Sequence, residues 1–243
     1  MLASAGASYL AFGPVIALAV GLLLGVVAIS YRQVCFGFPK GGGAYAVASS
    51  TLGTVPSLVA ASSLVIDYIL TAAVSTAAGV AAITSALPEL LPWRVELALG
   101  ALFLLVLANL RGLRESGRLF AIPTYLFVGG ALSVIGIGCL RIALGDPAVN
   151  WSQGVVVEAH DGMQLILPFL LLKAFAYGSV ALTGTEAISD GVAAFKKPEA
   201  KNAADTMAIM AVLLATIFFG MSLLAFAFGK VPQEVGGETL ISQ

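Results

Sequence analysis

The chain has 243 residues, of which 59% are hydrophobic and only 10% are charged. Soluble domains carry about 25% charged residues, so this composition excludes a water-soluble globular protein and predicts that lipid surrounds most of the chain. The net charge of −1 rests on few charged residues and says nothing about partners.

Apolar segments follow one another along the chain, and each is long enough, or nearly so, for the roughly 20 apolar residues of a membrane span. We predict six transmembrane helices in one all-α domain, residues 1–243, with no soluble domain. The first is not a signal peptide, because it lacks a basic start and exceeds the usual apolar core of about 7–15 residues. The six segments run approximately over residues 9–31, 57–87, 95–110, 119–144, 163–195 and 207–228.

A glycine-rich run, Phe38 to Tyr45, follows the first segment. It lacks the spacing of a phosphate-binding loop and follows a predicted helix rather than a strand. We therefore interpret it as a flexible cytoplasmic connection.

The second segment contains a carboxylate, Asp67. Thr71 and Ser75 follow at intervals of four, which places the three side chains on one face of a helix, and Tyr68 adds a phenol. Such oxygen ligands suit a small cation or an amine. Small and hydroxyl residues could equally serve only helix packing, but packing does not require the carboxylate.

The fifth segment contains Glu186, with Thr183 and Gly184 just before it. An ionisable group within the membrane costs about 2.5–3.5 kcal/mol on insertion scales and usually marks a function. Glycine lets the helix unwind, as in the discontinuous helices of secondary transporters. We predict a break between about Leu182 and Glu186. The alternative is a kinked helix in which Glu186 is protonated or hydrogen-bonded to a neighbour.

Two predictions about the site follow. Asp67, Thr71 or Ser75 should face the break at Thr183 across a shared cavity. Because desolvation disfavours the charged form of a carboxyl, Glu186 should be able to carry a proton near neutral pH.

The basic residues predict the orientation, because cytoplasmic loops are enriched in Lys and Arg. With the N-terminus outside, Trp93 and Trp151 lie at the outer boundary, Lys173 lies within a segment, and only Arg94, Arg141 and Lys230 are outside. The eight cytoplasmic residues are then Arg32, Lys40, Arg111, Arg114, Arg118, Lys196, Lys197 and Lys201.

The remaining reactive side chains indicate no catalytic or metal site. Cys35 and Cys139 lack the spacing of metal ligands, and His160 has no second ligand nearby in the sequence. The sequence contains no HExxH, GxSxG or paired histidines. We therefore expect no enzyme activity, no cofactor and no nucleic-acid partner.

Four strings resemble the amino acid–polyamine–organocation superfamily, and within it the KimA-type, KUP-related potassium importers. They are SYRQVCFGFPKGGGAYAVAS, LVIDYILTAAVSTAAGVAAITSA, LANLRGLRESG with AIPTYLF, and ALTGTEAISDGVAAFKKPEAKNAADT. The resemblance implies a LeuT-like fold of two inverted five-helix repeats, in which the first helix of each is broken. The six segments would match the second to seventh helices, so the chain looks truncated, without the first helix and the later ones.

The resemblance also implies roles. The positions in or beside the cation path are Asp67, Tyr68, Thr71, Ser75, Thr183 and Gly184, and the one matching Glu186 couples proton movement. It implies a multi-pass plasma membrane transporter that takes up potassium with protons. An amino acid permease remains the alternative, and an inactive fragment or membrane scaffold the second alternative. The sequence leaves open whether the protein is a homodimer.

Overall fold

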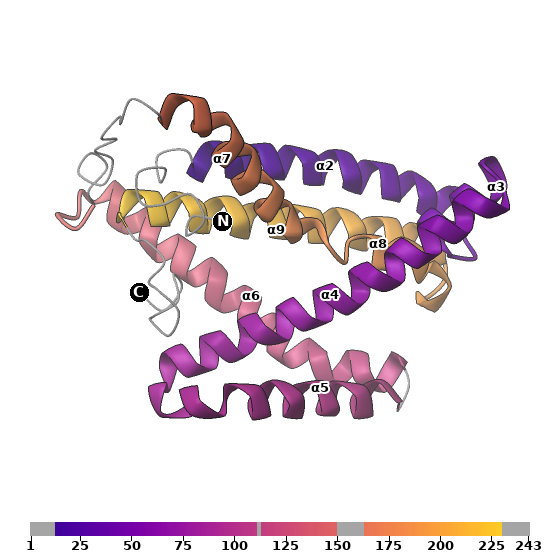
Figure 1. Ribbon diagram of the computed structural model, residues 1–243, viewed down its shortest axis with the longest axis horizontal. Helices are drawn as coiled ribbons and strands as arrows, with labels where there is room; N and C mark the ends of the chain where they lie inside the picture. Colours follow the sequence, from indigo (N-terminus) through magenta and orange to yellow (C-terminus); the bar gives the residue numbers. More distant parts are fainter. Residues whose placement is uncertain (1–12, 111–112, 150–162, 230–243) are drawn as a thin grey trace. The chain divides into compact units, whose positions relative to one another are not determined.

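The computed structural model describes residues 13–110, 113–149 and 163–229, and every regular element within these ranges is helical (Figure 1). The all-α prediction is therefore confirmed. Lipid offers no hydrogen-bond partners to the backbone, so an apolar segment must satisfy its own N–H and C=O groups, which a helix does. Trp151 and His160 lie outside the described residues.

Five helical stretches in the described ranges are long and apolar enough to cross a membrane. Between the first two lies the short helix α3 (Gly43–Thr51), and the 3-10 helix η2 (Pro88–Trp93) leads directly into α5. The long helices are α2 (Gly13–Gly37), α4 (Thr54–Ala86), α5 (Arg94–Leu110), α6 (Leu113–Ala143) and α9 (Glu199–Ala227).

The predicted fifth segment is divided as we expected. Helix α7 (Met163–Gly178) passes into the 3-10 helix η3 (Ser179–Leu182), and a short helix α8 (Glu186–Asp190) and the 3-10 turn η4 (Val192–Ala194) follow. Between η3 and α8, Thr183 is extended with ψ 142° and Gly184 has φ +85°. The predicted break near Gly184 is therefore confirmed. Because α7 has only 16 residues, the count of six membrane spans stays a prediction.

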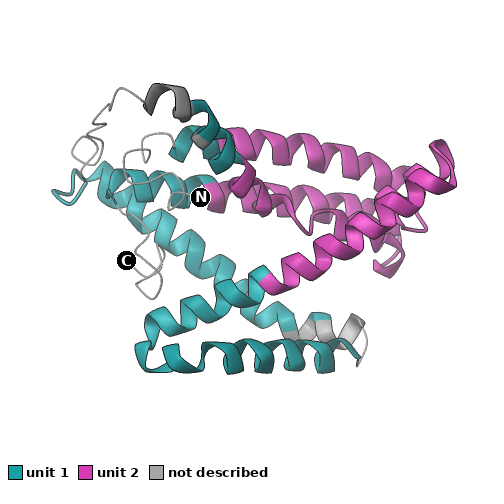
Figure 2. Ribbon diagram, in the orientation of Figure 1, with its two compact units in different colours: residues 1–17, 74–175, 219–243 teal, residues 18–73, 176–218 magenta. Residues whose placement is uncertain are grey.

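Contacts within the chain define two units, shown in Figure 2. Unit 1 contains residues 1–17, 74–175 and 219–243, and unit 2 contains residues 18–73 and 176–218.

The core of unit 2 lies between α2 and α9. Leu24 and Ala28 of α2 pack with Met207 and Ala211 of α9. In each helix the two residues are four apart and so share one face, and alanine lets membrane helices approach closely. A second cluster joins the end of α2 and η4 to the start of α9, and its buried members are Cys35, Val192, Ala203 and Ala204.

In unit 1, glycines let the end of α9 lie directly against α6. A Cβ atom on Gly220 would lie 2.7 Å from Ile135 Cδ1, and one on Gly138 would collide with Leu224. Small residues at helix contacts are typical of packing in lipid. Helix α5 also contacts α6.

The glycine-rich run forms a defined turn rather than the flexible connection that we expected. Gly41, Gly42 and Gly43 all have positive φ, at 85°, 95° and 40°. The Gly42 N–H donates a hydrogen bond of 3.0 Å to the main-chain oxygen of Asp190, and α3 contacts α8. The sequence reveals the glycines but not this distant partner.

Candidate functional site: a cavity beside the broken helix

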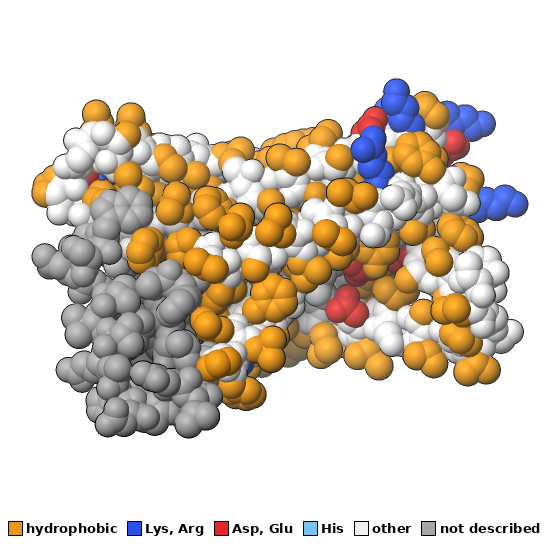
Figure 3. Space-filling model, turned by 90° about the horizontal axis from the view of Figure 1, so that it is seen from above, with side chains coloured by type: hydrophobic (Ala, Val, Ile, Leu, Met, Phe, Trp, Pro, Cys, Tyr) orange, Lys and Arg blue, Asp and Glu red, His pale blue; other side chains and the backbone are white. Residues whose placement is uncertain are grey.

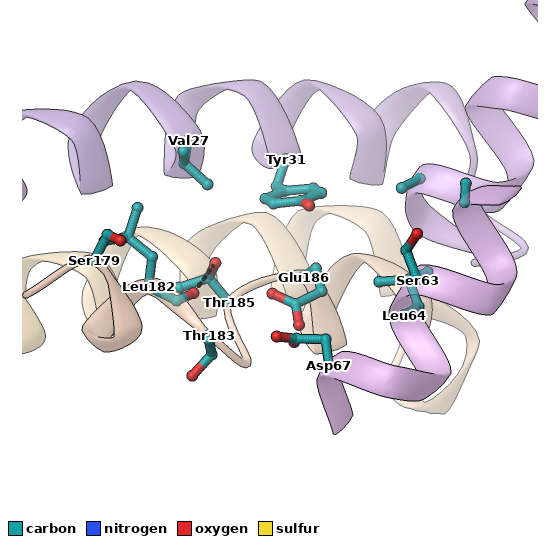
Figure 4. Close-up of a pocket in the computed structure, with 12 residues that line it drawn as sticks. Val27, Tyr31, Ser63, Leu64, Asp67, Ser179, Leu182, Thr183, Thr185 and Glu186 are labelled. Carbon is teal, nitrogen blue, oxygen red and sulfur yellow. Dashed lines mark hydrogen bonds between the residues drawn. The ribbon is translucent and has the colours of Figure 1, made fainter. Parts of the chain in front are cut away.

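Unit 2 contains an open cavity of about 420 Å³ beside the break in the fifth segment (Figure 4). Helices α2, α3 and α4 provide one part of its lining, and η3 with the residues after it provides another. The lining residues are Val27, Tyr31, Ala44, Ala60, Ser63, Leu64, Asp67, Ser179, Leu182, Thr183, Thr185 and Glu186.

Two carboxyl groups meet at this cavity. Figure 4 shows Asp67 of α4 and Glu186, the first residue of α8, pointing toward one another beside the ring of Tyr31. Glu186 is only 7% exposed. Two like charges brought together at low dielectric repel strongly. A cation between the two groups, or a proton on one of them, would relieve this repulsion.

Glu186 is held by the break itself. The N–H of Gly184 donates a hydrogen bond of 3.2 Å to Glu186 Oε1. With φ +85°, Gly184 turns its N–H toward the carboxyl group two residues later in the chain. The glycine therefore contributes backbone geometry that other residues rarely adopt.

The hydroxyl groups along this wall all donate to backbone carbonyls. Thr183 Oγ1 donates to Val180 O and Thr185 Oγ1 donates to Leu182 O, each at 2.8 Å. Ser179 Oγ likewise donates to the oxygen of the residue three before it, at 2.7 Å. Since a hydroxyl has one proton and two lone pairs, these three groups have only lone pairs left for a ligand.

The backbone N–H groups at the break also have partners. The N–H of Thr183 donates to Val180 O at 3.1 Å, and that of Thr185 donates to Leu182 O at 3.3 Å. Gly184 donates to Glu186, and Ala187 donates to Gly184 O at 3.3 Å. These four N–H groups are therefore not free to bind an anionic ligand.

The structure places three of the predicted site residues in the cavity wall: Asp67, Thr183 and Glu186. Gly184 lies between two lining residues and positions Glu186. The expected cavity shared by Asp67 and the break is therefore present.

Tyr68, Thr71 and Ser75 do not line this cavity. Thr71 is half-buried and Ser75 is exposed. A helix rises about 1.5 Å per residue, so residues four and eight positions after Asp67 lie roughly 6 and 12 Å further along α4. The three residues do follow one another along one side of α4, as predicted. A single binding site that included all three would have to extend roughly 12 Å along the helix.

Two residues of this region were not predicted from the sequence. Tyr31 lines the cavity from α2, and Asp190 accepts a hydrogen bond from the Tyr68 hydroxyl at 2.5 Å. Asp190 had a detectable signal, because it lies four residues after Glu186 and so one turn further along a helix. Tyr31 had none, since its position depends on how α2 packs.

The site offers a monovalent cation better ligands than it offers a transition metal. Among the described residues, no three His, Cys, Asp or Glu side chains gather in the way that such a metal requires. The available groups are carboxylate and hydroxyl oxygens, which suit hard cations.

A broken helix beside a cavity that contains two carboxyl groups, in an all-α membrane protein, is the arrangement of a secondary transporter. The family model for amino acid permeases matches residues 1–239, so the chain belongs to the amino acid permease family. In an alignment of 238 residues that covers 96% of this chain, it is also 45% identical to the potassium transporter KimA of Bacillus subtilis (strain 168). The chain spans 38% of the length of that relative.

Proposed function

We propose that this chain forms part of a secondary active transporter that takes up potassium together with protons. The observation that carries the proposal is that two carboxyl groups meet at the cavity, beside threonine hydroxyls that present only lone pairs to it. Its carboxyl groups come from Asp67 and Glu186, and the hydroxyls of Thr183 and Thr185 donate their protons to the backbone. Oxygen lone pairs attract a cation and repel an anion.

The same observation disfavours the alternative, an amino acid permease. Such a carrier is expected to hold the substrate carboxylate on free N–H groups of the unwound helix. Here the N–H groups of Thr183, Gly184, Thr185 and Ala187 are already hydrogen-bonded. The relative KimA is named as a potassium transporter, which supports the same choice.

Glu186 is our candidate for the proton-coupling group. Its burial disfavours the charged form, and the nearby carboxyl of Asp67 disfavours it further. We propose that a cation bound at Asp67 and a proton bound at Glu186 are taken up together, because two positive charges are needed to neutralise both carboxyl groups.

We further propose a multi-pass plasma membrane protein, with residues 1–243 as one permease domain and the N-terminus of this chain outside. Within unit 2, Lys and Arg side chains gather at one end (Figure 3). They come from the end of α2, the loop after it, the connection between η4 and α9, and the first turn of α9. These residues are Arg32, Lys40, Lys196, Lys197 and Lys201. This grouping supports a cytoplasmic location for that end. A homodimer is compatible with the proposal.

The decisive experiment is uptake by the full-length protein in cells that lack potassium import. We expect growth at low potassium and potassium uptake that increases as the outside becomes more acidic, and we expect no uptake of labelled amino acids. Asp67→Ala, expressed to the same level in the membrane, is the inactive control. Amino acid uptake without potassium uptake would establish the alternative. If the correctly inserted protein takes up neither potassium nor amino acids, the result would favour the second alternative, an inactive fragment or membrane scaffold.

A further inference from the structure

Glu186 has little support for a negative charge in the cavity. Its side chain accepts the N–H of Gly184 at 3.2 Å, and no side chain in the described ranges donates a hydrogen bond to it. The described residues that line the cavity include no Lys, Arg or His. Because a buried carboxylate depends on hydrogen-bond donors to keep its charge, one further donor in this cavity would determine how readily Glu186 releases a proton.

Two hydroxyl groups of the cavity wall remain as possible donors. The hydroxyls of the broken helix donate to backbone carbonyls. Tyr31 and Ser63 also line the cavity, and neither hydroxyl donates a hydrogen bond within the part of the chain that the structure describes. Figure 4 shows the Ser63 hydroxyl directed away from the two carboxyl groups, whereas Tyr31 lies beside Glu186. Tyr31 is therefore the hydroxyl that can serve Glu186.

Packing holds the ring of Tyr31 in this position. The half-buried ring contacts the core between α2 and α9, whose buried members are Leu24, Ala28, Met207 and Ala211. A tyrosine side chain has only two rotatable bonds, so a ring that is fixed by its neighbours also fixes the hydroxyl at its end. This hydroxyl carries one proton to donate, and the cavity wall presents it next to the buried carboxyl group.

We propose that the Tyr31 hydroxyl donates a hydrogen bond to Glu186 whenever this carboxyl group is charged, and that this bond sets the pH at which potassium uptake operates. The inference rests on the proposed function, because it takes Glu186 as the group that carries the coupled proton. Tyr31 is a positioning residue in this scheme, since it acts on transport through Glu186.

The other charged groups around Glu186 make such a donor useful. Asp67 faces Glu186 from α4, and Asp190 lies one turn further along α8, where it accepts the Tyr68 hydroxyl. On α2, Arg32 follows Tyr31, but its side chain lies 4.0 Å from Asp205 of α9. The neighbouring acids disfavour a charge on Glu186, and a phenol that donates to it opposes their effect.

The first test is the pH dependence of potassium uptake by full-length Tyr31→Phe, which keeps the ring and its packing. A hydrogen bond to the charged form favours that form, so without it Glu186 should hold its proton to a higher pH. One hydrogen bond to a charged group changes an equilibrium roughly tenfold. Half-maximal uptake should therefore move upwards by about one pH unit, while the half-saturating potassium concentration at acidic pH changes much less.

A stronger donor should have the opposite effect. Replacement of Tyr31 by 3-fluorotyrosine keeps the ring and makes the phenol a stronger acid, so half-maximal uptake should move to a lower pH. Opposite shifts from these two changes would not arise from a loss of packing. Tyr125→Phe is the matched control, because it removes an exposed phenol on α6, and it should behave as the parent does.

A double-mutant cycle assigns the effect to Glu186. Glu186→Gln cannot exchange a proton, so adding Tyr31→Phe to it should leave the half-saturating potassium concentration unchanged. The upward pH shift should persist when Tyr31→Phe is combined with Asp67→Asn, because Glu186 is intact there. A further change in half-saturation in the Glu186→Gln background would show that Tyr31 acts on the cation directly, and would overturn the inference.

A second measurement separates failure of this inference from failure of the proposed function. Infrared difference spectroscopy follows the protonated carboxyl band that disappears in Glu186→Gln, so it reads the titration of Glu186 without transport. If the parent takes up no potassium, the proposed function fails, and the coupling role assigned here fails with it. If the parent takes up potassium in a pH-dependent way, the inference alone is overturned when Tyr31→Phe leaves the midpoint of the band or of uptake at the parent's value.

Discussion

The N–H of Gly184 donates a hydrogen bond to the carboxyl group of Glu186, 3.2 Å away and two residues later in the chain. The helix is therefore broken at the residue that holds the buried carboxyl group in place. This relationship links the glycine's positive φ to the position of the carboxyl group in the cavity.

Glu186→Gln should uncouple transport from protons. Glutamine keeps the shape of the side chain and the acceptor for Gly184, but it cannot exchange a proton. Potassium uptake measured from pH 5.5 to 8 should become independent of pH, while potassium binding is comparatively unchanged. Uptake by the variant that follows pH as in the parent would contradict the role assigned to Glu186.

Asp67→Asn should mainly weaken the binding of potassium. It removes a ligand charge, and interactions with charged groups contribute about 1.5–3 kcal/mol, so the half-saturating potassium concentration should rise about tenfold or more. The pH dependence should persist, because Glu186 is intact. Ser62→Ala on the same helix is the control, since the exposed Ser62 hydroxyl donates a hydrogen bond to Leu58 O of its own helix. An unchanged half-saturation would remove Asp67 from the site.

Gly184→Ala should destabilise the protein through the backbone alone. A Cβ atom at this position meets nothing within 4 Å, but the left-handed φ of +85° costs a residue with a Cβ about 1–2 kcal/mol. The melting temperature in detergent should fall. Gly100→Ala is the matched control, because Gly100 lies in regular helix α5 with equally open space. Equal melting temperatures for the two variants would argue against a strained turn.

Gly220→Ala should disrupt packing in unit 1. Its Cβ would lie 2.7 Å from Ile135 Cδ1, and overpacking of this kind costs about 1–3 kcal/mol. Ile135→Ala should recover much of the loss in the double variant, because it removes the opposing atoms. Thermal unfolding of the four proteins measures this coupling, and purely additive effects would show that the two residues do not meet.

The ion pair at the end of α6 should respond to pH in a defined direction. The Arg141 side chain hydrogen-bonds Asp146 at 2.7 Å and, with the N–H of Ala148, holds the pKa of that carboxyl below its usual value. A lowered folded-state pKa stabilises the protein at neutral pH, and this contribution disappears as the pH falls through that value. Asp146→Asn should therefore have a slightly lower melting temperature than the parent at pH 7.

The difference between Asp146→Asn and the parent should shrink near pH 3 and also at high salt, because the pair is exposed and easily screened. A difference that stays constant with pH would show that the pair does not contribute through charge.

The sequence by itself was sufficient to predict that lipid surrounds the chain, that its segments are helices, and that Asp67 and Glu186 are candidate site residues. An apolar segment in lipid can satisfy its backbone only as a helix, so composition and segment length were sufficient for the all-α class. Glycine beside an intramembrane carboxyl predicted the break at Gly184, because both features act locally. The acidic residues Asp67 and Glu186 stood out because burial makes them costly.

Only the tertiary structure decided which side chains meet. Helical spacing placed Asp67, Thr71 and Ser75 on one face, but the cavity extends along α4 only as far as Asp67. Tyr31 enters the site through the packing of α2 against α9. Asp190 meets Tyr68 and the glycine turn through contacts between residues far apart in the chain, and local patterns do not encode such contacts because they depend on how whole helices pack.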